Sequence, residues 1–564
     1  MSAGAEELDA LLGDPQDDAN PVGYRAVLAA DEQGELPAEG EKLLDAWCLN
    51  AEFVPAEYGG RLIRADHLAE VLRTLWRRDP ALGLGYGFAS FLASVNVWTA
   101  GSPEQRRDTA DRLLANQRIA AAFHELEHGT DFAYADCAAA PTPSGWSLTG
   151  RKEVVTNLRR AEAAVVFART GPDAGRRGHS LFLVARDALP ADRVRDLPRQ
   201  GSSGMRGVQL GGVQFTDCPI PADALIGGEG RGMEIALRAF QVTRAVLPSL
   251  FVGPLDTALR TALDCATARR LYGGAVTDLP YVRSVIARAY ADLLAVDAFA
   301  GVAIRGLHLA PESMAAYAPA VKYLTSRMVL DAVEDLRSVL GASGYLRQGP
   351  YAIFQKTARD LAPATFAHVS RTACLVMLLP QLPRLARRSW LAAPAADPAL
   401  FDLGAQLPAL DLGALVAGMA RGDGVLGALA ETAERGGGDP AVRFAARFRD
   451  ELRTLREDCR ALMPTDLTGA ASSAAFDLAD RYTMLLAAAS VLAVWQRGAR
   501  YPAELLPGVL DRLAGRLPGP ALLSASEREE AERRLFDSAV ERHREHRLFD
   551  LTARRVPGGG KDTL

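Results

Sequence analysis

Two short segments combine residue types that could hold a phosphate group. Residues 125–131, Glu-Leu-Glu-His-Gly-Thr-Asp, place Thr130 beside a glycine, so that backbone amides can approach an anionic diphosphate and the hydroxyl adds one donor. Arg269 opens the segment Arg-Arg-Leu-Tyr-Gly and has the planar fork that pairs bidentately with phosphate oxygens. Taken alone, a plain turn and a solvated helix end are the more common explanations of these two patterns.

The elements that would position these residues follow the order helices, strands, helices. Apolar residues recur at helical spacing on both sides of a central region, in which short runs rich in Val, Phe and Leu are separated by Gly, Pro and Asp. This segregated order favours an α+β fold over alternating βαβ units with a parallel sheet. The expected helices include 40–49, 65–77, 282–304 and 319–340, and the expected strands include 163–168, 180–184 and 208–215.

Size and composition exclude several classes of protein. A chain of 564 residues with 49% hydrophobic and 24% charged residues is expected to form two or more globular domains. The net charge of -5 gives no electrostatic footprint for nucleic acid or an anionic membrane surface. The six cysteines form no CxxC pair or metal-ligand cluster, so we expect reduced thiols in a cytoplasmic protein without a metal site. The longest apolar run, 484–495, is shorter than the roughly 20 residues of a membrane span and predicts a buried helix.

Several motifs between about residues 50 and 385 resemble, in order, those of the acyl-CoA dehydrogenase and oxidase superfamily. The resemblance implies an FAD site in which His124, Thr130 and Thr156 take the flavin-contact positions of the family. It also implies that Arg269, Ser338 and Gly341 lie against the FAD of a neighbouring subunit. In addition to 125–131 and 269–273, the motifs are 53–60, 102–105, 150–157, 204–207, 228–232 and 338–345.

Some of these positions depart from the family pattern. Val154 stands where the family has a tryptophan that covers the flavin, Ser338 replaces a glutamine, and Ala342 replaces the second glycine of its loop. His124 stands where a flavin-contacting threonine is usual. At each of these positions the chain matches the cofactor site of the family less well.

The resemblance implies a particular division of the chain and a particular set of partners. We expect an N-terminal helical domain at 1–118, a central β-barrel-like domain at 119–225, a C-terminal four-helix bundle at 226–388 and an additional helical extension at 389–564. The substrate would be an acyl thioester carried by coenzyme A or by an acyl carrier protein. The assembly would be a homodimer or a dimer of dimers, with no nucleic acid bound and no membrane span.

The catalytic glutamate of the family is missing. Ungapped alignment from Arg359 puts His368 on that glutamate, and the alternative base position, one residue before Arg244, is Thr243. A neighbouring cation disfavours imidazolium, so His368 would be neutral near pH 7 and able to accept a proton.

Three functions therefore stay open at the level of sequence. The first is α,β-desaturation of an acyl thioester with His368 as the substitute base and Arg244 beside it. The second keeps FAD but changes the reaction to an oxygenation or a redox-neutral rearrangement in specialised metabolism. The third is a non-catalytic partner subunit of a hetero-oligomeric dehydrogenase.

Overall fold

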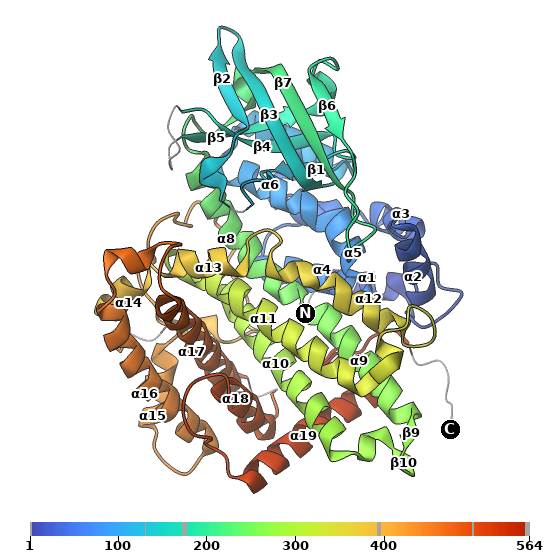
Figure 1. Ribbon diagram of the computed structural model, residues 1–564, viewed down its shortest axis with the longest axis vertical. Helices are drawn as coiled ribbons and strands as arrows, with labels where there is room; N and C mark the ends of the chain where they lie inside the picture. The colour runs from blue at the N-terminus through green and yellow to red at the C-terminus, as the bar shows by residue number, and fades with distance from the viewer. Residues whose placement is uncertain (1–2, 130, 172–177, 392–395, 499–500, 559–564) are drawn as a thin grey trace.

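The computed structural model describes residues 3–129, 131–171, 178–391, 396–498 and 501–558, so Thr130 lies outside the described residues. A sheet stands at one end of the molecule, and helices from before and after it in the sequence form the rest (Figure 1). The helices of the N-terminal part are α1 (Ala3–Leu12), α2 (Tyr24–Gln33), α3 (Ala38–Ala46), α4 (Ala65–Arg78), α5 (Pro80–Leu82), α6 (Ala89–Ala100) and α7 (Pro103–Leu114).

The Ser-Pro-Glu-Gln motif of this part starts α7 and joins it to the sheet. Ser102 and Gln105 form a capping box, in which each side chain accepts a hydrogen bond from the other residue's backbone amide. The side-chain amide nitrogen of Gln105 also donates to the carbonyl oxygens of Asp223 and Leu225, at 2.7 and 3.2 Å. A local helix signal in the sequence therefore also fixes a contact between two parts of the chain.

The middle of the chain forms one eight-stranded sheet with the order β6-β7-β3-β2-β4-β5-β8, and β1 pairs with β4. The pairs are antiparallel except β1 with β4 and β2 with β4, which are parallel. The sheet has a hydrophobic core of its own, in which the rings of Trp146 and Phe182 lie 5.4 Å apart. The strands are β1 (Ile119–Ala122), β2 (Ala138–Thr142), β3 (Gly145–Thr156), β4 (Ala163–Arg169), β5 (His179–Ala185), β6 (Val194–Leu197), β7 (Leu210–Pro221) and β8 (Leu225–Ile226).

An irregularity in β3 shapes the end of the strand that carries Thr156. The register between β3 and β7 shifts between Lys152 and Val155, and Val154 within the shift has φ of 55°. Such a bulge bends a strand and re-aims its side chains. The last residues of β3 are thereby turned relative to the rest of the strand.

The second helical part contains the long helices that the sequence predicts. Its first long pair of helices ends at Ala268, the next helix runs from Pro280 to Leu309, and the one after it from Met314 to Leu340. The elements are α8 (Gly232–Leu250), α9 (Val252–Ala268), the short strands β9 (Arg270–Leu271) and β10 (Gly274–Ala275), α10 (Pro280–Leu309), α11 (Met314–Leu340), α12 (Ala352–Asp360), α13 (Arg371–Leu378) and α14 (Leu382–Arg388).

The last part is helical and packs along α10 and α11 (Figure 1). Its helices are α15 (Gly427–Glu434), α16 (Pro440–Arg460), α17 (Ser473–Arg497), α18 (Leu506–Ala514) and α19 (Ala525–Arg544). The α+β class and the helix, sheet, helix order are therefore as the sequence predicts. The boundaries between domains stay predictions.

Within the described residues, three helical stretches are long and apolar enough to cross a membrane. They are Pro80–Ala100, Gly232–Ala268 and Ser473–Arg497, and 89%, 89% and 83% of their most apolar windows are buried inside the protein. The predicted buried helix around 484–495 lies in the third of these stretches. Other parts of the chain cover most of its apolar surface.

Candidate active site

A cavity of about 310 Å³ lies between the sheet and the helices. Its lining includes Thr156 at the end of β3, Gly204 and Met205 before β7, and Phe240 on α8. The segment after α12 also lines it, as far as His368. The volume is at the lower end of the range of small-molecule sites, about 300–1,000 Å³.

A buried cluster of charged side chains connects elements that surround this cavity. The Lys356 ammonium lies 2.6 Å from a carboxylate oxygen of Asp79 and 2.6 Å from one of Asp360, and the other Asp360 oxygen accepts a hydrogen bond from the Met205 amide at 2.6 Å. Both helical parts and the sheet region thus meet at one cluster. A Cβ on Gly204 would lie 2.4 Å from a backbone oxygen of α12, so only glycine fits this approach.

Aromatic rings make much of the cavity wall. Phe123 lies 5.2 Å from Phe240 and 5.9 Å from Phe132, between ring centroids, and all three rings line the cavity with Phe366. Such rings keep water away from a bound group and strengthen electrostatic interactions inside the site.

His368 presents its imidazole to this cavity. Its Nε2 lies 2.6 Å from the Oγ1 of Thr243, and its ring meets the Phe240 ring edge-on at 4.7 Å. Its backbone has φ of 66°, a left-handed conformation that is uncommon for a side-chain-bearing residue and that clusters at functional sites. The structure thus brings together the two alternative base positions, His368 and Thr243.

Burial and two nearby cations set the protonation state of His368. Burial, followed by the charges of Arg244 and Lys322, holds the pKa of His368 well below its usual 6.5. Neither cation forms an ion pair with a carboxylate among the described residues: Lys322 Nζ donates to the carbonyl oxygen of Ala364, and Arg244 Nη1 lies 3.3 Å from the sulfur of Met377. His368 is therefore neutral at pH 7, as the neighbouring Arg244 predicts.

The two described flavin-contact candidates on the sheet side also line the cavity. His124 Nδ1 lies 3.1 Å from the carbonyl oxygen of Glu153, which fixes the position of its ring. The Thr156 hydroxyl makes no hydrogen bond with another described residue. It is therefore available to a ligand in the cavity.

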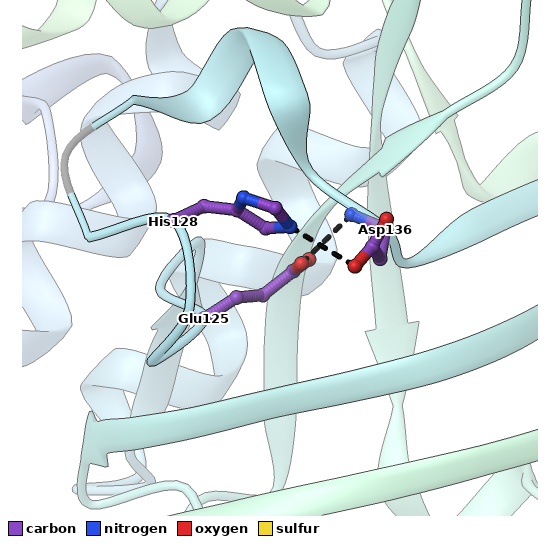
Figure 2. A group of neighbouring side chains, drawn as sticks. All are labelled: Glu125, His128 and Asp136. Atoms are coloured by element: carbon purple, nitrogen blue, oxygen red, sulfur yellow. Dashed lines mark hydrogen bonds and ion pairs between the residues drawn. The ribbon is translucent and has the colours of Figure 1, made fainter.

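The loop that leads from His124 toward β2 is closed by three side chains, which Figure 2 shows converging. Glu125 accepts hydrogen bonds from the amides of Asp136 and Cys137, at 2.8 and 3.2 Å, and His128 Nε2 lies 3.0 Å from a carboxylate oxygen of Asp136. The ligand atoms of Glu125, His128 and Asp136 are close enough together to hold a metal ion. The Lys152 ammonium, however, lies 2.6 Å from Glu125 and supplies the positive charge there, so this cluster closes the loop.

The remaining predicted cofactor residues lie elsewhere and do not line the cavity. Arg269 Nη1 lies 3.5 Å from the carbonyl oxygen of Leu340, beside Gly341, and the Ser338 hydroxyl donates to the carbonyl oxygen of Asp335. In Figure 1, β9, which follows Arg269, lies at the opposite end of the molecule from the sheet. The structure therefore divides the predicted cofactor residues into two groups.

Family models and curated relatives identify the same part of the chain. The model described as "Acyl-CoA dehydrogenase, middle domain" matches residues 120–218, and "Acyl-CoA dehydrogenase, C-terminal domain" matches residues 230–367. Mitochondrial isovaleryl-CoA dehydrogenase of Oryza sativa subsp. japonica is 24% identical over 57% of this chain and 78% of its own length. The probable acyl-CoA dehydrogenase FadE25 of Mycobacterium tuberculosis (strain ATCC 25618 / H37Rv) is 27% identical over 58% of this chain and 84% of its own length. Residues 120–218 and 230–367 belong to the acyl-CoA dehydrogenase superfamily.

Solved structures share the fold over about two thirds of the chain. Butyryl-CoA dehydrogenase from Megasphaera elsdenii has a TM-score of 0.59 and 18% identity, and covers 67% of this chain and 97% of its own. The prolyl acyl carrier protein oxidase AnaB has a TM-score of 0.61 and 18% identity, with the same coverage. The rest of this chain has no counterpart in these two structures.

Members of the superfamily are flavin oxidoreductases that act on CH–CH bonds and use FAD. The described residues fit one part of this cofactor, because the cavity has aromatic walls and a free Thr156 hydroxyl. A cavity of about 310 Å³ suits a flavin ring or an acyl chain, whereas a whole dinucleotide must extend beyond it. Arg269 and Gly341, away from this cavity, combine a guanidinium with a glycine turn, a pairing that suits phosphate oxygens.

The sequence analysis did not predict some residues of the site. Phe123 and Phe132 flank the 125–131 loop in sequence, so their position beside a recognised motif could have indicated them. Lys322 and Asp79 carried no local signal, because their role depends on contacts with residues far away in the chain.

Proposed function

We propose that the protein is an FAD-dependent oxidoreductase that desaturates an acyl thioester between its α and β carbons, with His368 as the base that takes the α-proton. One observation carries the proposal: His368 and Thr156, the candidate base and the candidate flavin contact, line the same cavity. A proton acceptor and a flavin-binding hydroxyl that share one aromatic cavity suit removal of two hydrogens from one acyl group.

The residues of the chain have separate tasks in this reaction. Bound FAD would supply the acceptor for the hydride from the β carbon. The Thr156 hydroxyl would donate to the flavin edge, and His124 lines the same cavity. Neutral His368 accepts the α-proton, and burial together with the charge of Arg244 keeps the imidazole neutral before that step. The phenylalanine walls exclude water.

The cofactor site is proposed to be complete only in a dimer. His124 and Thr156 serve one end of FAD, and Arg269, Ser338 and Gly341 of a second copy serve the other. The separation of these two groups within one chain supports this arrangement (Figure 1). The protein is therefore proposed to be a homodimer or a dimer of dimers.

The acyl group is proposed to arrive on coenzyme A or on a carrier protein, in the cytoplasm. Curated relatives are named for acyl-CoA substrates, and one solved relative is named for a prolyl carrier-protein substrate. All six cysteines are free thiols, which supports a reducing compartment.

The test of the proposal begins with the colour of the purified protein. We expect a flavin absorption spectrum that is bleached by an acyl thioester under anaerobic conditions. The His368→Ala variant should keep the spectrum and lose about 100- to 10,000-fold in turnover. The exposed His546, changed to Ala, is the matched control and should behave as the wild type. Wild-type turnover by His368→Ala would remove His368 from the mechanism.

Three further variants and the properties of the purified protein distinguish the other functions and test the dimer. If desaturation appears only after His368→Glu, the natural reaction of the flavoenzyme is a different one. A colourless protein that copurifies with a catalytic homologue would instead be a non-catalytic subunit.

Arg269→Ala should release FAD, whereas Arg270→Ala, at the exposed neighbouring residue, should retain it. A monomer that holds FAD tightly would contradict the cross-subunit site.

A further inference from the structure

The two ring nitrogens of His368 have different surroundings. Nε2 lies 2.6 Å from the Thr243 hydroxyl, whereas Nδ1 makes no hydrogen bond with any described residue. Since the ring lines the cavity, Nδ1 is the nitrogen left for a substrate. A neutral imidazole can accept a proton only at the nitrogen that carries none, so its tautomer decides whether His368 can act there as a base.

The Thr243 hydroxyl has a second neighbour that fixes the direction of its proton. Its Oγ1 lies 3.3 Å from the carbonyl oxygen of Phe240, three residues earlier on α8. Threonine in a helix commonly donates to such a carbonyl, and a carbonyl oxygen can only accept. A hydroxyl that donates to Phe240 turns a lone pair toward Nε2, and Nε2 must then carry the hydrogen of the ring.

We propose that Thr243 is a positioning residue that holds His368 with its hydrogen on Nε2 and its lone pair on Nδ1, facing the cavity. This inference rests on the proposed role of His368 as the base. The chain of donors runs from Nε2–H to Thr243 Oγ1 and from the Thr243 hydroxyl to the Phe240 carbonyl. When Nδ1 takes the α-proton, the ring becomes cationic and the Nε2–H bond to Thr243 becomes charge-assisted, which strengthens it.

The geometry also explains why the hydroxyl is needed in this place. Arg244 and Lys322 lie near the ring and disfavour imidazolium. Among the described residues, the ring of His368 contacts Thr243 and Phe240 and lies near these two cations, and no carboxylate is placed to orient it. A neutral acceptor on Nε2 sets the tautomer without adding a charge to the cavity wall.

The test reads the tautomer directly by NMR. The holoenzyme is labelled with ¹⁵N-histidine, and the His368 signals among the eight histidines are assigned from their loss in His368→Gln. We expect one tautomer, with the hydrogen on Nε2, in the wild type and in Thr243→Ser. Thr243→Val keeps the shape of the side chain but removes the hydroxyl, and should give a mixture of tautomers. Hydrogen on Nδ1 in the wild type, or an unchanged spectrum in Thr243→Val, would overturn the inference.

Kinetics provide the second readout. Thr243→Val should lower kcat by about 10- to 100-fold at unchanged KM, less than the loss of the base itself, and Thr243→Ser should restore most of it. A wild-type protein that binds no FAD, or that does not turn over an acyl thioester, would refute the proposed function. The tautomer of His368 could still be measured in it. An active enzyme whose His368 carries hydrogen on Nδ1 would refute only the role of Thr243.

Discussion

The ammonium group of Lys356, on α12, forms a buried ion pair with the carboxylate of Asp79, which caps α5. Both side chains are about 2% exposed, and Asp360 completes the group. Removal of one partner from such a cluster leaves uncompensated buried charge, which typically costs about 3–5 kcal/mol.

Lys356→Met is therefore expected to lower the free energy of unfolding by about that amount, roughly 3–5 kcal/mol. The measurement is the urea midpoint of the purified protein. The matched control is Lys42→Met, because Lys42 pairs with Glu39 at 2.7 Å on the surface, and exposed pairs contribute about 0–1 kcal/mol. Equal midpoint shifts in the two variants would contradict a structural role for the buried cluster.

Lys322 should have the opposite effect on stability. Burial lowers the pKa of Lys322 to about 8 from its usual 10.5, so its charge is disfavoured in the folded protein. Above pH 10.5 the lysine is neutral in both the folded and the unfolded protein. The free energy of unfolding then falls as pH drops from about 10.5 to about 8, where the folded protein must take up the charge. At pH 7, Lys322→Met should stabilise the protein by on the order of 3 kcal/mol.

The pH dependence checks the cause of this effect. The difference in thermal midpoint between the wild type and Lys322→Met should shrink as pH rises from about 8 to about 10.5. Lys42→Met again serves as the exposed control, with no comparable trend. A lower midpoint for Lys322→Met at pH 7 would mean that the hydrogen bond to Ala364 outweighs the cost of burial.

The loop of Figure 2 should weaken as pH rises. The hydrogen bond to Asp136 raises the pKa of His128 above its usual 6.5. A raised pKa in the folded state means that the contribution is fully present below pH 6.5 and is lost as pH rises through the raised value. The thermal midpoint of His128→Asn should therefore lie below that of the wild type at pH 5.5 and approach it at pH 9. Asp136→Asn should remove the same trend, and a midpoint difference that is independent of pH would contradict the ion pair.

A buried carboxylate holds the helical extension against the rest of the protein. Asp423 accepts hydrogen bonds from Tyr317 on α11 at 3.0 Å, from Tyr482 on α17 at 2.9 Å and from Trp390 at 3.1 Å. Asp423→Ala leaves these donors unsatisfied, at about 1–3 kcal/mol each. We expect a large fall in the unfolding midpoint and a smaller one in Asp423→Asn, which keeps one acceptor oxygen.

The control for this variant is Asp411→Ala, because the exposed side chain of Asp411 accepts a hydrogen bond only from the Gly413 amide among the described residues. Its midpoint should stay close to that of the wild type. If Asp423→Ala behaves like Asp411→Ala, the extension is held by its apolar contacts alone.

Local periodicity and motif order predicted the arrangement of the chain well, because long amphipathic helices and Val-rich strands carry their signal in neighbouring residues. The predicted segments 65–77 and 163–168 correspond to α4 and β4. The strands β1 and β2 were harder to predict, because Ile119–Ala122 and Ala138–Thr142 consist mostly of alanine, which has a weak preference for strands. Their pairing with neighbouring strands decides their structure.

The candidate site also contains residues that the sequence predicts and residues that it does not. His368, Thr243 and Arg244 were placed by motifs, and the structure brings them together around one ring. The position of Lys322 near that ring could not be predicted, because it depends on how α11 packs against α8. The tautomer of His368 likewise depends on a hydroxyl 125 residues away.

Residues 549–554 pack against helices from the first half of the chain. Asp550 pairs with Arg73 on α4 at 3.0 Å, Arg554 pairs with Asp9 on α1 at 2.8 Å, and the Phe549 amide donates to Asp256 on α9. During synthesis the first helices leave the ribosome on the order of tens of seconds before these partners exist. Arg73 and Asp9 must stay hydrated or pair elsewhere during that interval. Final closure of the N-terminal helices is therefore a post-translational event, and a chain that stalls before residue 549 cannot complete it.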